Sequence, residues 1–333
     1  MNINQRILEL ARKVKGRVVM PEGFDIRVLK AAQRLTKDGI ASIILPVDDV
    51  KKTEKTAAEA GIDLSGIEII KTDRNLLDEK KIEEFVSARV RKGMAEQEAL
   101  ELLNKPLYFS MMYLKSGKCK ACVGGAVYDT ADVLRAGLHV IGTAGNVKMI
   151  SSYFLMIPPE GHNLVKDPVL FADCAVNPDP QAVGLRDIAV ATVGSFKRLF
   201  PDRQANVAML SFSTKGSAGS KILSKVTEAT ALAKAYFAGN SDVNVDGELQ
   251  FDAAVVPSVG KRKAPDSLVA GNANIFIFPE LNAGNIGCKI AERYGGFRAI
   301  GPVIQGLALP VSDLSRGASV DDIYLISAVM LLD

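Results

Sequence analysis

A hydroxyl, a guanidinium and a carboxylate fall within eight residues near the end of the chain, at Ser315, Arg316 and Asp322. An arginine can hold a phosphate in a bidentate fork, a serine can donate to a developing oxyanion, and an aspartate can accept a proton. Ser319 and Asp322 also have the spacing of a capping box at the start of a helix, and the pattern by itself favours that cap. The segment predicts an anion site whose carboxylate is either a base or a cap.

A second polar segment, residues 211–220, combines hydroxyls, glycines and one lysine. It follows an apolar run that predicts a strand and precedes a predicted helix, which is where open α/β sheets bind ligands. Free N–H groups and the dipole at a helix N-terminus favour oxyanions. The same residues would also serve simply to turn the chain and cap the helix, and the pattern leaves both interpretations open.

The two histidines and four cysteines of the chain give little support to other chemistry. His139 lies in an apolar stretch that predicts a packed side chain rather than a metal ligand or a member of a catalytic triad. Cys119 and Cys122 form a single C-x-x-C pair; a structural zinc site needs a second pair, so we interpret both as packing or loop thiols and predict no metal site. No G-x-G-x-x-G or G-x-x-x-x-G-K-[ST] motif is present, which argues against nucleotide sites of those kinds.

The elements that must position these segments alternate between strand and helix. Short apolar runs predict strands at 17–20, 41–46, 67–71, 207–212, 253–256 and 274–278. Periodic and capped segments predict helices at 3–14, 25–37, 48–60, 76–91, 95–104 and 221–238. Residues 158–180, rich in Pro, Gly and Asp, predict a loop or a short hairpin. This alternation predicts an α/β protein with mainly parallel sheets and helices on both faces.

The length and composition indicate an ordinary globular protein of two domains. The chain has 333 residues, and single hydrophobic cores stop growing near roughly 250–300 residues. A net charge of +3 indicates neither nucleic-acid nor membrane binding. No segment approaches the ~18 consecutive apolar residues of a membrane helix, and the N-terminus predicts an amphipathic helix rather than a signal peptide. Four cysteines are too few for a disulfide scaffold, and we expect a cytoplasmic protein.

Six segments, in the same order along the chain, resemble the phosphate acetyltransferase family. They are residues 207–218, 246–253, 270–279, 282–287, 301–306 and 313–317. Any one of them could match by chance, but six in order over more than a hundred residues indicate a true relationship. The likeness covers essentially the whole chain. Residues 133–142 and 171–174 look closest to the branch found in ethanolamine-utilisation acetyltransferases.

The resemblance implies an architecture and a reaction. It implies two three-layer α/β/α domains, similar to those of isocitrate and isopropylmalate dehydrogenases, with the active site in a cleft between them. The first would comprise residues 1–145 plus 299–333, and the second, which would form a homodimer, residues 146–298. It further implies that coenzyme A and acetyl phosphate react directly to give acetyl-CoA and phosphate. No metal, other cofactor or acyl-enzyme would take part.

The resemblance also implies roles for particular residues. Ser315 and Arg316 match the family's catalytic pair, and Asp322 matches its proposed general base. Arg89 and Arg135 match arginines that bind coenzyme A. Binding of phosphate or acyl phosphate would fall to the second polar segment and the residue after Asp129, namely Ser213, Thr214, Lys215, Gly216, Ser217 and Thr130. Tyr128 and Asp129 stand where many members have His-Ser, which bears on the choice of acyl group.

Three alternatives follow from the same residues. The first is transfer of a propionyl or butyryl group in place of acetyl. The second is a two-domain NAD-dependent dehydrogenase of related fold, which the missing cofactor motif and missing metal-ligand carboxylates oppose. The third is a non-catalytic acyl-CoA-binding module, which the presence of Ser315, Arg316 and Asp322 opposes.

Overall fold

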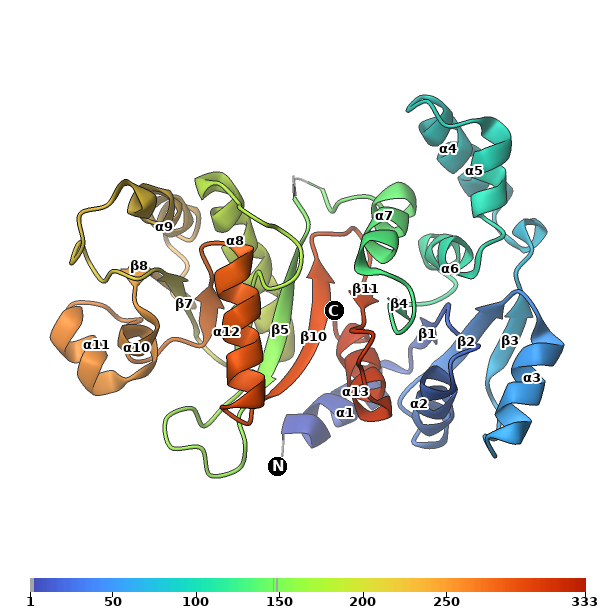
Figure 1. Cartoon of the computed structure of the whole chain (residues 1–333), viewed down its shortest axis with the longest axis horizontal. Helices are drawn as coiled ribbons and strands as arrows, with labels where there is room; N and C mark the ends of the chain where they lie inside the picture. The colour runs from blue at the N-terminus through green and yellow to red at the C-terminus, as the bar shows by residue number, and fades with distance from the viewer. Residues whose placement is uncertain (1–2, 146, 148) are drawn as a thin grey trace. The chain divides into compact units, whose positions relative to one another are not determined.

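The structure, a computed structural model, describes residues 3–145, 147 and 149–333. Contacts between Cα atoms divide these residues into two units. The first unit comprises the described residues up to 145 together with 307–333, and the second comprises the described residues of 147–306. Figure 1 shows how the chain runs through helices and strands in each.

The first unit is built on five parallel strands. They are β1 (Arg17–Val19), β2 (Ser42–Val47), β3 (Glu68–Lys71), β4 (Ala121–Gly124) and β11 (Val311–Asp313). Their order is β3-β2-β1-β4-β11, and each neighbouring pair is parallel. Val18 of β1 lies opposite Ile43 and Ala121 of its two neighbours. These apolar runs suit strands that are covered on both faces by helices.

Eight α-helices and one short 3₁₀ helix accompany these strands among the described residues. The helices are α1 (Ile3–Val14), α2 (Ile26–Lys37), α3 (Val50–Glu59), α4 (Glu79–Val90), α5 (Glu96–Leu102), α6 (Pro106–Lys115), α7 (Thr130–Val140), α13 (Val320–Met330) and η1 (Arg74–Leu76). Helix α13 contacts α1, α2 and β4, whereas α6 and α7 contact one another and cover the opposite face (Figure 1). The two helical layers bury most of the sheet between them, whereas the edge strand β3 stays partly exposed.

Local sequence explains where α2 begins and which face it buries. Asp25 caps the helix, since its side chain accepts a hydrogen bond from the Arg27 amide at 2.7 Å. Val28, Ala32 and Leu35 recur at helical spacing and are buried. Helix α6 is different, because every residue from its first, Pro106, through Leu114 is buried. A helix that is covered on all sides has no amphipathic period, which explains why the sequence did not predict it.

The second unit contains a mixed sheet of six strands. They are β5 (Ser151–Ile157), β6 (Val169–Ala172), β7 (Ala205–Leu210), β8 (Val243–Leu249), β9 (Ile275–Ile277) and β10 (Arg298–Gln305), in the order β10-β5-β6-β9-β7-β8. The pairs of β5 with β10 and with β6 are antiparallel, and the other three pairs are parallel. The predicted domain limits put residues 299–306 with the first domain. The pairing of β10 with β5 instead groups these residues with the second unit.

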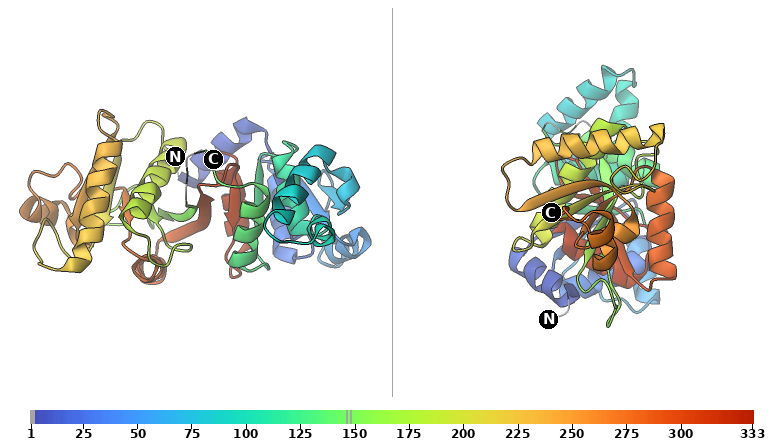
Figure 2. Two further views of the ribbon diagram at one scale, coloured as in Figure 1. Left: turned by 90° about the horizontal axis from the view of Figure 1, so that it is seen from above. Right: turned by 90° about the vertical axis from the view of Figure 1, so that its left-hand side faces the viewer.

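The second unit's sheet is also covered on both faces. Its helices are α8 (Ala182–Leu199), α9 (Ser224–Tyr236), α10 (Phe251–Val255), α11 (Pro257–Lys263), α12 (Leu281–Arg293) and the 3₁₀ turn η2 (Lys221–Leu223). Helices α8 and α9 lie together on one face and α12 on the opposite face (Figure 2). A cluster of aromatic residues fills the face under α10 and α12, where Phe171 contacts Phe251, Phe276 and Phe278.

One sequence prediction in this unit was wrong, and a second was incomplete. Residues 253–256, predicted as a strand, belong mostly to helix α10, and the strand before them is β8. Residues 158–180, predicted as a loop or hairpin, contain β6, which pairs with β5 and β9 inside the sheet. A short apolar run does not distinguish a strand from a buried helix by its periodicity, and this ambiguity explains the error. None of the described helices is long and apolar enough to cross a membrane.

Candidate active site

The strand order of the first unit reverses between β1 and β4, and the loops after these strands carry the candidate site. The chain passes from β1 to β2 and β3 on one side, while β4 and β11 lie on the other. Ligands of open α/β sheets bind outside the carboxyl ends of the strands at such a reversal. Three loops begin at this edge, at residues 20–25, 125–129 and 314–319. The predicted residues Ser315 and Arg316 lie on the third.

Glu22, in the loop after β1, holds the loop after β4. Its side chain is fully buried, and its carboxylate accepts hydrogen bonds from the amides of Ala126, Val127 and Tyr128 at 2.7–2.8 Å. Burial raises the pKa of Glu22, and the three amides oppose that rise because they favour the ionised form. The Glu22 carboxylate therefore binds the backbone of the neighbouring loop through these three hydrogen bonds.

Asp313, the last residue of β11, lies on the other side of the same loop. It is 1% exposed, and neither carboxylate oxygen accepts a hydrogen bond of ordinary geometry. Burial raises the pKa of Asp313 to about 7; the nearby Glu22 carboxylate adds to the rise, and Thr130 and Arg316 oppose it. Gly125 packs against this carboxylate with φ of +100°, and a Cβ atom there would clash with Asp313 Oδ1 and with the Leu314 nitrogen. Only glycine fits this close approach.

Ser315 and Arg316 are exposed near the start of the third loop. Arg316 Nη1 pairs with Asp129 Oδ1 at 2.8 Å, and the two side chains are 73% and 64% exposed. An ion pair this exposed contributes little to stability. Ser315 Oγ accepts a weak hydrogen bond from the Gly317 amide at 3.3 Å. Both side chains present polar groups to solvent at the carboxyl edge of the sheet.

Asp322 forms the capping box that its spacing predicts. Its Oδ2 accepts hydrogen bonds from the Ser319 amide at 3.0 Å and from the Ser319 hydroxyl at 2.7 Å, and Ser319 Oγ accepts one from the Asp322 amide at 3.2 Å. The box begins α13 and lies in the same segment as Ser315 and Arg316. The structure shows the cap, and the role of Asp322 as a base stays a prediction.

The two arginines predicted to bind coenzyme A belong to α4 and α7. Arg89 is 7% exposed, and its buried Nε has no hydrogen-bond acceptor. Arg135 is exposed and donates to Asp132 at 2.6 Å on the same helix. The positive charges of Arg89 and Arg135 both influence the pKa values of two nearby side chains, which are Tyr108 and His139. Burial lowers the pKa of His139, and both arginines lower it further.

Arg135, Tyr108 and His139 line a cavity of about 510 Å³ within the first unit. Its walls come from α5, α6, α7 and the loop after β4, and include Tyr108, Tyr128, Asp132, Arg135 and His139. The Tyr108 hydroxyl and His139 Nδ1 lie 3.2 Å apart and share a hydrogen bond. His139, predicted to be packed, is half-buried at the wall of this cavity. The cavity walls carry aromatic rings, the cations Lys105 and Arg135, and three carboxylates. The rings and cations suit a ligand that carries both a ring and phosphates.

The polar loop of the second unit is folded onto its own carboxylates. Glu248 Oε1 accepts hydrogen bonds from Ser213 Oγ at 2.9 Å and from the Gly216 amide at 2.7 Å. Thr214 accepts from the Gln250 amide, the Thr214 amide donates to Ser217 Oγ, and Lys215 pairs with Asp246. Five residues predicted to bind phosphate are therefore brought together, but their contacts are with this chain. Phosphate binding by this loop stays a prediction.

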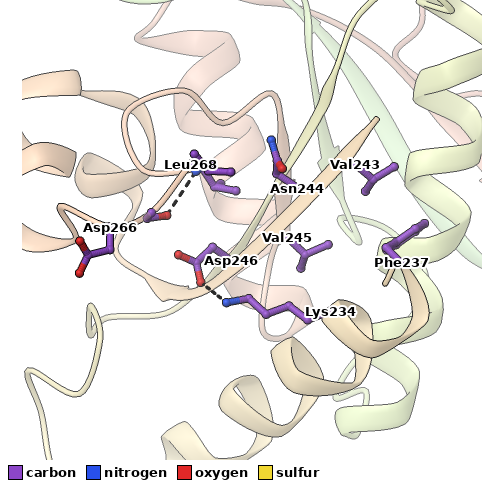
Figure 3. A pocket seen from close by; sticks show the side chains of 10 residues that line it. Lys234, Phe237, Val243, Asn244, Val245, Asp246, Asp266 and Leu268 are labelled. Atoms are coloured by element: carbon purple, nitrogen blue, oxygen red, sulfur yellow. Dashed lines mark hydrogen bonds and ion pairs between the residues drawn. The ribbon is translucent and has the colours of Figure 1, made fainter. Parts of the chain in front are cut away.

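Asp246 is the carboxylate at the centre of those contacts. It is buried and pairs with both Lys215 and Lys234, the latter at 2.7 Å. Burial alone would raise the pKa of Asp246, but the hydrogen bonds from Lys215 and Lys234 lower it to about 2. Figure 3 shows Asp246 and Lys234 pointing toward one another beside a cavity of about 270 Å³. The arrangement is a buried carboxylate paired with two lysines, and it connects the loop and α9 to β8.

The cysteines take part in packing. All four are free and buried, and burial raises the pKa of Cys119 to about 12. Cys122 lies in β4, and burial also raises the pKa of its thiol well above the usual value. No group of three or more His, Cys, Asp or Glu side chains among the described residues is placed to hold a metal ion.

Sequence reasoning missed three residues of this site. They are Glu22, Arg27 and Asp313, none of which the sequence singled out. Each earns its place through contacts between the loops after β1, β4 and β11. A charged residue directly after a buried strand was the available signal, because strand ends meet at one edge of a parallel sheet.

The chain is similar to known proteins over its whole length. The family model described as phosphate acetyl/butaryl transferase matches residues 2–331. A phosphate acetyltransferase from Clostridium acetobutylicum is 41% identical over 332 residues, which cover 100% of this chain and 98% of that protein.

Two solved structures share the fold at 39% sequence identity. One is the EutD phosphotransacetylase from Staphylococcus aureus, with a TM-score of 0.86 and coverage of 99% of this chain and 98% of that chain. The other is a phosphotransacetylase from Streptococcus pyogenes, with a TM-score of 0.87 and coverage of 98% of each chain. These matches confirm the resemblance inferred from the six ordered segments.

Proposed function

Because the chain belongs to the phosphate acetyl/butaryl transferase family, we propose that it transfers an acetyl group reversibly between coenzyme A and inorganic phosphate. The observation that carries this proposal is the family match over residues 2–331. The relatives named phosphate acetyltransferase support it with similarity over nearly the full length of both chains. The site at the carboxyl edge of the first unit supplies suitable groups.

In the proposed reaction the thiolate of coenzyme A attacks the acetyl carbonyl of acetyl phosphate. A carbon–sulfur bond forms, the carbon–oxygen bond to phosphate breaks, and the phosphate leaves with the electron pair. Ser315 donates a hydrogen bond to the oxyanion, and Arg316 meets the charge on the leaving phosphate. The exposed Asp129 is a weak partner for Arg316, so exchanging it for phosphate costs little.

Asp322 is the proposed acceptor of the thiol proton. A thiol of pKa ~8.5 and an ordinary aspartate of pKa ~3.9 differ by about 4.6 units, so the transfer costs about 6 kcal/mol unless the site narrows the gap. Neighbouring arginines favour the thiolate, and exclusion of water favours the protonated acid. Asp313 has a better matched pKa of about 7, but at 1% exposure it does not reach a substrate.

We assign coenzyme A to Arg89 and Arg135, next to the cavity in the first unit. The cavity walls offer Tyr108, Tyr128 and His139 for a flat ring and Arg135 for a phosphate. Arg89 adds a buried guanidinium whose Nε has no partner in the chain. These features support the assignment, because a buried unpaired donor is costly until a ligand satisfies it.

The remaining parts of the proposal concern the state of the protein. We propose a cytoplasmic homodimer that needs no metal or cofactor beyond its substrates, as the family resemblance implies. Light scattering of the purified chain measures the mass of the assembly directly. Activity that is unchanged after treatment with a chelator would support the metal-free reaction.

The deciding experiment offers the purified protein coenzyme A with acetyl, propionyl or butyryl phosphate and follows formation of the thioester. We expect acetyl-CoA to form fastest, with no added metal. A preference for propionyl or butyryl phosphate would change the acyl group and keep the reaction. No thioester with any of the three, together with reduction of NAD by a hydroxy acid, would overturn the proposal.

A further inference from the structure

Arg27 connects the two loops that carry the proposed reaction. It is the second residue of α2, and its side chain reaches over the carboxyl edge of the sheet. Its Nη1 donates to the carbonyl oxygens of Arg316 at 2.7 Å and Ala318 at 3.0 Å. Its Nη2 donates to the carbonyl oxygen of Ala126 at 2.8 Å. One guanidinium thus contacts the loop after β4 and the loop after β11.

Asp25 fixes the orientation of this guanidinium. Arg27 Nε donates to Asp25 Oδ1 at 3.1 Å, and Nη2 donates to Asp25 Oδ2 at 2.8 Å. The Arg27 side chain has five N–H donors, and these five contacts give each donor an acceptor. Burial alone would raise the pKa of Asp25, but the hydrogen bonds from Arg27 lower it, so the pair is charged and bidentate.

Besides Arg27, the exposed ion pair of Arg316 with Asp129 joins the same two loops. Glu22 accepts the amides of residues 126–128, and Arg27 takes the carbonyl of Ala126 in the same loop. In the other loop, the two carbonyls that Arg27 binds belong to Arg316 and to a residue two positions later. The Arg316 side chain itself is exposed and pairs only with exposed Asp129 in the described contacts. Arg27 is therefore the contact that fixes the backbone of Arg316.

We propose that Arg27 is a positioning residue for acyl transfer. It holds the backbone of Arg316 where the exposed guanidinium of that residue meets the phosphate, and it does not itself contact the reacting atoms. This proposal rests on the proposed function. A lysine cannot fully replace Arg27, because an ammonium group has three donors on one atom and lacks the planar fork of a guanidinium.

The test compares three variants of the full-length chain. Arg27→Gln removes the guanidinium, and Arg27→Lys keeps the charge without the fork. Arg34→Gln is the matched control: Arg34 lies on the same helix, pairs with Asp321 of α13, and stacks over Tyr324 at 4.1 Å. For each variant, kcat, KM for acetyl phosphate and for coenzyme A, and the melting temperature are measured. Guanidinium salt is then added to test for rescue.

We expect Arg27→Gln to lower kcat about 100-fold, the scale of a 1 Å misplacement. Both KM values should change less than about threefold, and guanidinium should restore part of kcat. Arg27→Lys should lie between Arg27→Gln and the unmodified chain, and Arg34→Gln should keep normal kcat. If Arg27→Gln keeps the kcat of Arg34→Gln, or neither lysine nor guanidinium restores a folded variant, the positioning role is wrong.

A second readout separates this proposal from the proposed function. Amide hydrogen exchange of residues 126–128 and 316–318 reports the fixation of the loops without any reaction. We expect faster exchange there in Arg27→Gln than in Arg34→Gln. If the unmodified chain transfers no acyl group, the proposed function fails, and exchange still decides the contact. Equal exchange in the two variants would show that Arg27 does not hold the loops.

Discussion

Two buried aspartates, one in each unit, have opposite surroundings. Asp246 pairs with Lys215 and Lys234, and these cations lower its pKa to about 2. Asp313 has no lysine or arginine at ion-pair distance among the described contacts, and burial raises its pKa to about 7. An aspartate side chain is therefore ionised at position 246 and keeps its proton to near-neutral pH at position 313.

The loops above these aspartates differ in the same way. In the loop that contains Lys215, hydroxyl, amide and ammonium groups donate to the carboxylates of Glu248 and Asp246. The loop with Ser315 and Arg316 is fixed through its backbone, so its polar side chains stay exposed. A composition rich in hydroxyls and cations therefore predicts anion binding only where the fold leaves those groups without hydrogen-bond partners in the chain itself.

The largest expected effect concerns Asp322, which the structure shows as a cap and the family resemblance assigns as a base. A pure cap predicts a loss of about 1 kcal/mol or less for Asp322→Asn, since Asn still accepts a hydrogen bond. A general base is worth roughly 10²–10⁴-fold in rate. We expect kcat to fall by that amount with a nearly unchanged melting temperature, and to recover partly toward pH 9 as the thiol ionises unaided.

The contrary result for Asp322 is equally specific. Near-normal kcat at pH 7 with a lowered melting temperature would leave it as a cap only. The role of Asp322 would then resemble that of Glu248, whose carboxylate only accepts hydrogen bonds from a neighbouring loop. The matched control is Asp321→Asn, because that exposed neighbour pairs with Arg34 and lies outside the capping box.

The next effect compares the exposed arginine with the paired lysine. Arg316→Gln should lower kcat about 10²–10³-fold with a smaller change in KM, because the lost contact is strongest in the transition state. Lys215→Gln should keep kcat within about threefold and lower stability by roughly 1 kcal/mol, since Lys234 still pairs with Asp246. Steady-state kinetics and thermal unfolding measure both. A raised KM for phosphate in Lys215→Gln would restore anion binding to its loop and break the comparison.

The last expected effect is on stability and its pH dependence rather than on kcat, through the proton on Asp313. The folded chain keeps this proton up to pH about 7, whereas an unfolded aspartate loses it near pH ~3.9. The raised pKa means that stability falls as pH rises through this window, by up to roughly 4 kcal/mol. Asp313→Asn removes the titration. The variant's melting temperature should exceed that of the unmodified chain at pH 8, and the difference should shrink toward pH 4.

Calorimetry at several pH values measures that difference. Asp246→Asn serves as the opposite case, since a lowered pKa contributes stability above pH ~3.9 that is lost as pH falls toward 2. Two variants with parallel pH profiles would show that the surroundings of the two aspartates do not differ as described.

The sequence predicted the elements that have a clear period or cap and missed those that do not. Helix α2 begins at its capping Asp25, as its pattern indicates, whereas α6 is apolar on every side. Strand β8 was missed because Asp246 and Glu248 interrupt its apolar run. These acids lie in the strand because Lys215, Lys234 and Ser213 reach them from elsewhere in the chain. Partners distant in sequence leave no mark on local periodicity.

The residues of the candidate site also fall into those that the sequence could predict and those that it could not. Ser315, Arg316 and Asp322 could be predicted together, because one segment carries all three. Glu22 and Arg27 could not, because they act on residues about a hundred or more positions away. Their role depends on β1, β4 and β11 being neighbours in the sheet. That order is a property of the fold, and a single sequence does not state it.

The burial of all four cysteines has a consequence for an enzyme that handles an activated acyl group. An acyl phosphate acylates any accessible thiolate, and self-acylation would consume substrate and block the protein. Cys119 and Cys122 are shielded in or beside β4, and their raised pKa values keep them protonated. Cys174 and Cys288 are enclosed in the core of the second unit. Burial thus keeps the four thiols of the folded chain away from an acyl phosphate in solution, whereas the thiol of a bound substrate is free to react.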